Sequence, residues 1–123
     1  QQCRTEATEE RWVENEKTCP TLGQMSFAEW QQSLARDTAP PAGLSLALQG
    51  LWHDARGDWD AAHTAAQEDH GRDGSWVHAY LHRKEGDLGN AGYWYARAGR
   101  KMPAATVTLE TEATDIAREL LAR

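Results

Sequence analysis

Apolar residues recur three and four positions apart along most of the chain after residue 25. This is the spacing of helices that bury one face. Six stretches show it, within residues 26–37, 44–56, 58–66, 75–85, 87–98 and 108–121. The pattern therefore predicts an all-α fold.

Residues that start and stop helices stand at the boundaries of these stretches. Ser26 and Glu29 have the spacing of a capping box, which begins a helix. Ser75 and Thr108 are expected to cap two later helices. Pro40-Pro41 makes the connector after the first helix stiff.

A short phrase occurs twice between helical stretches. Gly57-Asp58-Trp59 and Gly86-Asp87-Leu88 are separated by 29 positions, since 86 − 57 = 29. In each, glycine can end one helix and aspartate can cap the next. The repeat predicts two stacked helix–turn–helix hairpins. We expect a preceding helix from Ser26, and a C-terminal capping helix from Thr108 that closes the exposed end of the stack.

Composition fits one soluble globular domain. The chain has 123 residues, of which 40 % are hydrophobic and 26 % charged, so it is long enough to bury a core. It contains six tryptophans and one phenylalanine, which predicts a core of indoles packed against small residues. We expect a single domain over residues 25–123 and a polar extension over residues 1–24.

Charge and cysteine content narrow the function classes. A net charge of −6 argues against nucleic-acid binding, and no apolar run is long enough for a membrane span. Cys3 and Cys19 lack the CxxC spacing and a flanking histidine, so they do not suggest zinc. We expect a cytoplasmic protein. The alternative is an exported protein in which the two cysteines form a disulfide.

The two hairpins resemble tetratricopeptide and Sel1-like repeats over about residues 44–103. Gly50 and Ala79 stand where such repeats have a small residue, and Asn90–Gly99 is similar to the second helix of a Sel1-like unit. The period of 29 is shorter than that of these families. The stretch Trp76–Asp87 also resembles a segment of small uncharacterised bacterial proteins, which implies a bacterial origin.

The repeat resemblance implies a concave face formed by the first helix of each hairpin. The residues expected on this face are Leu51, Asp54, Trp76, Tyr80, Arg83 and Lys84. An aromatic floor beside two basic residues predicts a small non-catalytic interaction module that binds a protein or an acidic peptide. A homodimer is an alternative partner. No phosphate loop, nucleophile elbow or dinucleotide fingerprint occurs, so neither an enzyme nor a cofactor is expected.

Histidines suggest a second function, the binding of a metal ion or another small ligand. His78 and His82 are four positions apart on one predicted helix, so both rings can reach one ion. His53 lies 29 positions before His82 and is the favoured third ligand, with Asp54 and His63 as alternatives. Packing against a neighbouring helix is the competing interpretation. Because Ala79 follows His78, the glutamate base of a zinc-protease helix is missing. We therefore expect any bound metal to be structural.

Overall fold

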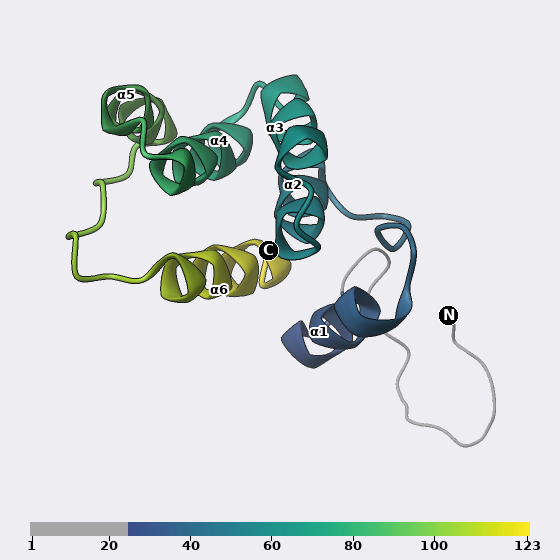
Figure 1. Cartoon of the computed structure of the whole chain (residues 1–123). Helices are drawn as coiled ribbons and strands as arrows, with labels where there is room; N and C mark the ends of the chain where they lie inside the picture. Colours follow the sequence, from purple (N-terminus) through teal and green to yellow (C-terminus); the bar gives the residue numbers. More distant parts are fainter. Residues whose placement is uncertain (1–24) are drawn as a thin grey trace, which may run out of the picture.

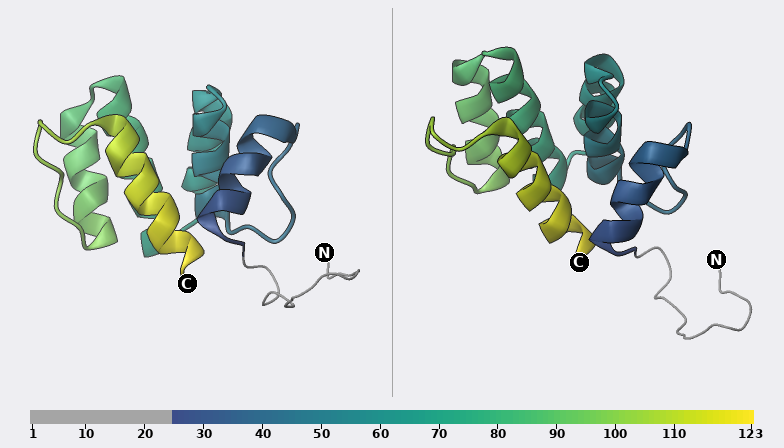
Figure 2. Two further views of the ribbon diagram at one scale, coloured as in Figure 1. Left: turned by 90° about the horizontal axis from the view of Figure 1, so that it is seen from below. Right: turned by 60° about the horizontal axis from the view of Figure 1, so that its bottom comes forward.

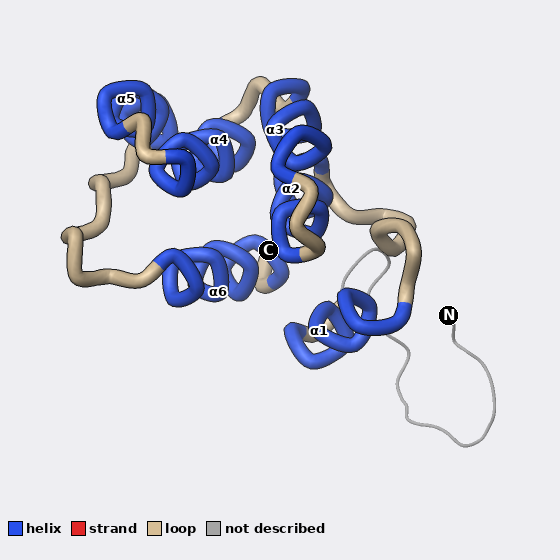
Figure 3. The backbone as a smooth tube through the Cα atoms, viewed as in Figure 1, coloured by secondary structure: helices blue, strands red, loops and turns tan. Residues whose placement is uncertain are grey.

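The computed structural model describes residues 25–123, which form six helices joined by loops, with no strand in that range (Figures 1 and 3). The helices are α1 (Phe27–Arg36), α2 (Leu46–Ala55), α3 (Trp59–Glu68), α4 (Arg72–Glu85), α5 (Leu88–Ala98) and α6 (Leu109–Leu121). The predicted all-α class is confirmed. The expectations for Cys3, Cys19 and the extension over residues 1–24 lie outside the described residues.

Side chains cap most of the helix starts. At α1, Glu29 N donates to Ser26 Oγ (3.1 Å) and Ser26 N donates to Glu29 Oε1 (2.8 Å), so the capping box is complete. At α6, Thr111 N donates to Thr108 Oγ1 at 3.0 Å. These bonds satisfy amide groups that have no acceptor within the helix.

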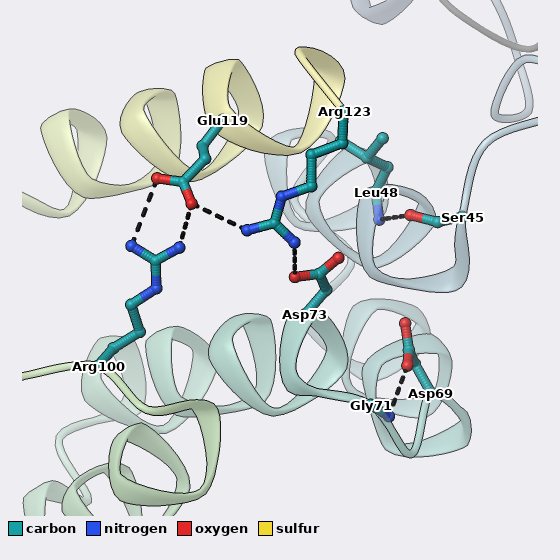
Figure 4. Close-up of polar contacts among 8 residues, drawn as sticks. All are labelled: Ser45, Leu48, Asp69, Gly71, Asp73, Arg100, Glu119 and Arg123. Atoms are coloured by element: carbon teal, nitrogen blue, oxygen red, sulfur yellow. Dashed lines mark hydrogen bonds and ion pairs between the residues drawn. The ribbon is translucent and has the colours of Figure 1, made fainter.

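The predicted cap at Ser75 is wrong. Helix α4 begins at Arg72, and Ser75 is buried inside its first turns. Gly71 is the N-cap residue and has no side chain to bond with the helix. Its own amide instead donates to Asp69 Oδ1 at 2.9 Å, which holds the chain as it enters the helix (Figure 4).

Both glycine–aspartate phrases form turns between packed helices. Gly57 and Gly86 have φ angles of +84° and +91°, in the left-handed region that glycine adopts without strain. Asp58 and Asp87 then cap α3 and α5 by accepting from amides three residues later. Helix α2 packs against α3, and α4 packs against both α5 and α3.

The last helix, α6, packs across α4, α2 and α1, whereas the sequence predicted that it closes the exposed end of the stack. Figure 2 shows it between the α4–α5 pair and α1. The loop over residues 99–108 is long enough to carry the chain back, and α6 then buries Ile116, Ala117 and Leu120. The apolar face of α6 thus covers part of the predicted concave surface.

Ion pairs fix the far end of α6. Glu119 accepts from both Arg100 and Arg123, and Arg123 also donates to Asp73 at the start of α4 (Figure 4). The end of α6 is therefore linked to α4 and to the residue that follows the α5 cap.

The core combines indoles with small side chains, as the composition predicts. Trp52 is 2 % exposed, and its indole N–H donates to Ser33 Oγ at 3.0 Å, so its polar atom is satisfied. Ala47 and Ala62 are fully buried beside it in the same core cluster. No helix within residues 25–123 has the length and apolar character that a membrane crossing requires.

Candidate functional site

Three histidines from two helices meet at the packed face of α3 and α4. His78 and His82 are one helical turn apart on α4, and His63 reaches them from α3. One ring nitrogen from each of the three lies within 4.8 Å of the others. The spacing of four residues within α4 and the packing of α3 on α4 bring these rings together.

The hydrogen bonds of the cluster orient its rings. His63 Nε2 and His78 Nε2 are 3.0 Å apart, so the N–H of one ring donates a hydrogen bond to the nitrogen of the other. His82 Nδ1 lies 2.6 Å from Glu85 Oε2, a short hydrogen bond in which the ring N–H donates to the carboxylate. In the tautomer that carries its one proton on Nδ1, His82 has the lone pair on Nε2 available to another ligand.

Two indoles stack on the histidine rings. The Trp94 ring lies 4.0 Å from that of His78 with an interplanar angle of 20°. The Trp59 ring lies 4.8 Å from that of His63 at 12°. Trp59 is itself held by a 3.1 Å hydrogen bond from its indole N–H to the Leu81 carbonyl. These contacts restrict the rotation of His63 and His78 and shield one face of each.

The surroundings of His63 and His78 favour their neutral forms. His78 is 5 % exposed and His82 is 8 % exposed. Burial, and then the neighbouring His63 and His82, lowers the pKa of His78 from 6.5 to about 4. Burial and His82 also lower the pKa of His63, against the opposing carboxylates of Glu85 and Asp60. His63 and His78 are therefore neutral at pH 7, which is the form that binds metals.

The arrangement fits a small transition-metal ion. Zinc binds imidazole nitrogens at about 2.0–2.1 Å, so two ligands of a tetrahedral ion are separated by about 3.3 Å. The His63–His78 separation of 3.0 Å is slightly shorter than this, and all three ligand atoms lie within 4.8 Å. A small outward shift of that pair and an inward shift of His82 would let an ion replace the shared proton. Imidazole ligands suit zinc, copper and nickel better than magnesium or calcium.

The structure changes the predicted ligand set in one position. His78 and His82 do meet, but the third histidine is His63 and not His53, which belongs to no such cluster within residues 25–123. His53 lies on α2, where its ring and the Trp52 ring form a T-shaped contact with centroids 5.7 Å apart. The 29-residue offset relates His53 to His82, so it identifies equivalent positions on different helices. The only sequence signal for His63 was its position on α3, the helix that directly precedes α4 in the chain.

Five of the six predicted partner-binding residues divide between two cavities. Four of them line a groove of about 380 Å³ between α1, α2, α4 and α6; these are Leu51, Asp54, Tyr80 and Lys84. Trp76 instead lines a separate cavity of about 330 Å³, where the Arg100 guanidinium lies 3.8 Å from its ring centre.

The basic residues of the predicted face are paired within the chain. Lys84 Nζ lies 2.8 Å from Asp54 Oδ1, and the Tyr80 hydroxyl donates to the other oxygen of that carboxylate at 2.8 Å. Arg83 donates to Glu112 Oε1 at 2.7 Å and to the Val107 carbonyl, and its side chain is only 10 % exposed. The positive charges of Arg83 and Lys84, which were expected to attract an acidic peptide, are therefore neutralised by carboxylates of the same chain.

Comparisons with protein-family models, with curated proteins and with solved structures find no match to this chain. The fold and site themselves define an all-α protein with a partly buried cluster of three histidines between two packed helices.

Proposed function

We propose that this protein binds one transition-metal ion of the zinc class through His63, His78 and His82. The observation that carries the proposal is the convergence of three imidazole nitrogens to within 4.8 Å. The lowered pKa values of His63 and His78 add support, because protons then compete little with the metal at pH 7.

The hydrogen bonding of His78 favours this function over simple packing. Within residues 25–123, its one hydrogen-bond partner is another imidazole, His63, and no carbonyl or carboxylate takes that place. A buried polar side chain whose only role is packing would stabilise the fold more with a carbonyl or carboxylate acceptor. An apolar residue in its place would also be more stabilising. A metal ion gives all three rings a common partner.

The proposed ion has a structural or binding role. It would join α3 to α4 and so connect the α2–α3 pair to the α4–α5 pair. The nearest carboxylate, that of Glu85, bonds to His82 Nδ1 and orients this ligand. Among residues 25–123, no further carboxylate joins the three histidines, and the role we propose for the ion is non-catalytic.

Zinc titration of the purified, untagged full chain tests the proposal. We expect one zinc ion per chain by calorimetry, and affinity at least tenfold weaker in His63→Ala and His78→Ala. His53→Ala is the matched control, because His53 lies outside the cluster, and it should bind like the wild type. Unchanged binding in His63→Ala, or its loss in His53→Ala, would refute the proposed site.

A second candidate function uses the groove between α1, α2, α4 and α6. Apolar side chains including Phe27, Leu34 and Leu109 line it, and Asp54 and Lys84 neutralise each other inside it. Glu110 is an exposed lining carboxylate without an ion pair in the described part of the chain. We propose as occupant an amphipathic helix from a protein partner, with apolar anchors and one basic residue that faces Glu110.

Peptide binding distinguishes this second candidate from the first. A synthetic amphipathic helix with a leucine stripe and one lysine should bind the wild type more tightly than its glutamate twin. Glu110→Lys should reverse that preference, whereas His63→Ala should not alter it. Equal binding of the two peptides to the wild type would contradict the proposed occupant.

A further inference from the structure

The three-histidine cluster supplies fewer ligands than a closed tetrahedral site needs. Structural zinc sites have four protein ligands, whereas sites with three keep a position for an outside donor. Within residues 25–123, no fourth histidine, cysteine or carboxylate atom belongs to the group formed by His63, His78 and His82. Glu85 and Asp87 group with His82 alone.

Those two carboxylates are already engaged. Glu85 accepts from His82 Nδ1 at 2.6 Å, on the ring edge opposite Nε2. Asp87 caps α5, where it accepts from the Asn90 amide at 3.2 Å and from its side chain at 2.9 Å. Coordination of the ion by Glu85 would break the hydrogen bond that orients His82. Coordination by Asp87 would break the hydrogen bonds that cap α5.

Charge determines which donor the remaining position prefers. Three neutral imidazoles leave the double positive charge of the ion uncompensated by its direct ligands. The site is partly desolvated, since His78 and His82 are each less than 9 % exposed, so this charge is poorly screened. An anionic donor therefore gains more at this position than a neutral one.

The cluster is accessible from one side. His63 is half-buried, and its stacking partner Trp59 is also half-buried. Glu85, next to His82, has 39 % of its side chain exposed. Because His78 and His82 are buried and His63 is only half-buried, the exposed part of the cluster is limited, which favours small donors.

We infer that the bound ion keeps one coordination position, and that this position takes a small anion from solution. The inference rests on the proposed metal site. It adds a ligand class, small anions such as carboxylates, to a site whose other ligands come from the chain.

Cobalt substitution of the full chain tests this inference. Co²⁺ bound by three imidazoles and one further donor absorbs visible light, and its spectrum changes when a ligand is exchanged. The first measurement is the appearance of this absorption on Co²⁺ addition, and its loss in His63→Ala. No absorption in the wild type would overturn the proposed function, and the inference with it.

The second measurement adds azide, a small anion, to the cobalt-loaded protein. We expect a saturable change in the visible bands, with acetate competing for the same position. Bands that appear with Co²⁺ but do not respond to azide would overturn the inference and leave the metal site intact.

A thiolate of the chain is the competing fourth ligand. In a Cys3→Ser and Cys19→Ser double variant, the cobalt spectrum and the azide response should equal those of the wild type. A sulfur-to-cobalt charge-transfer band in the wild type that disappears in this variant would contradict an open position.

Discussion

Glu85 is the residue that most directly controls the basicity of a proposed ligand. Its carboxylate lies 2.6 Å from His82 Nδ1, so it fixes the proton on that nitrogen and leaves Nε2 for the metal. Without this hydrogen bond, the proton of His82 can move from Nδ1 to Nε2. The affinity of the His82 ring for a metal ion then falls.

We therefore expect Glu85→Gln to weaken zinc binding by about 10- to 100-fold, the usual effect of losing such a partner. Competition with a chromophoric chelator measures this change. Asp60→Asn is the control, because Asp60 acts on His63 only through its charge. An equal loss in both variants would mean that general electrostatics, and not the His82 bond, is responsible.

The metal-free protein should lose stability in acid through His78. Its pKa is lowered from 6.5 to about 4 in the folded chain, so between these values the unfolded chain binds the proton more readily. The free energy of unfolding should then fall by up to about 1.4 kcal/mol per pH unit as the pH drops from 6.5 towards 4. Above pH 6.5 this group makes no contribution to the pH dependence.

Urea unfolding at pH 7 and pH 5 in the presence of a chelator measures this loss. His78→Gln removes the titrating ring and should show a smaller decrease between the two pH values. The same decrease in both proteins would exclude His78 as its source.

Residue spacing predicted only part of the cluster. His78 and His82 are on one helix, where four positions of separation fix their relative direction. The third ligand depends on the rotation of α3 against α4, a tertiary property that periodicity does not specify. The sequence therefore left His53, Asp54 and His63 as alternatives, and packing selected His63.

At the scale of elements, the junction of α3 and α4 leaves no room for a side chain at Gly74. A Cβ atom added to Gly74 would lie 2.2 Å from the Asp69 carbonyl oxygen. Gly71 and Gly74 both precede Ser75, the residue expected to cap the helix, so the start of α4 was predicted too late. The close approach of the two helices requires the second glycine.

Gly74→Ala should destabilise the protein by about 1–3 kcal/mol, because the start of α4 must move away from Asp69. Gly89→Ala is the matched control, since a Cβ there meets nothing within 4 Å. The control should be neutral or stabilising by up to about 1 kcal/mol through helix propensity. Thermal unfolding compares them, and equal stability of the two variants would contradict the steric argument.

On the scale of the whole molecule, a buried ion pair and a buried hydrogen bond attach α6 to α4 and α5. Glu112 is 5 % exposed and accepts from both Arg83 and Tyr95, which come from α4 and α5. Arg83 and Glu112 are 29 positions apart in the chain. Because that pairing is not local, the sequence made Arg83 look like a free basic residue on a binding face.

Glu112→Gln should destabilise the fold by about 3–5 kcal/mol, because it leaves the buried Arg83 charge without its counter-ion. Glu110→Gln is the control on the same helix turn; its side chain is exposed and the change should cost less than about 0.5 kcal/mol. Denaturant unfolding at pH 7 measures both variants. A small effect of Glu112→Gln would show that the buried pair with Arg83 contributes little to holding α6 in place.

The central claim is that His63, His78 and His82 bind one ion together, and zinc-edge X-ray absorption of the loaded protein tests it most directly. We predict nitrogen neighbours at about 2.0–2.1 Å and outer-shell scattering from three imidazoles, reduced to two in His63→Ala. An all-oxygen shell, scattering from fewer than three imidazoles in the wild type, or an imidazole count unchanged in His63→Ala would contradict the claim.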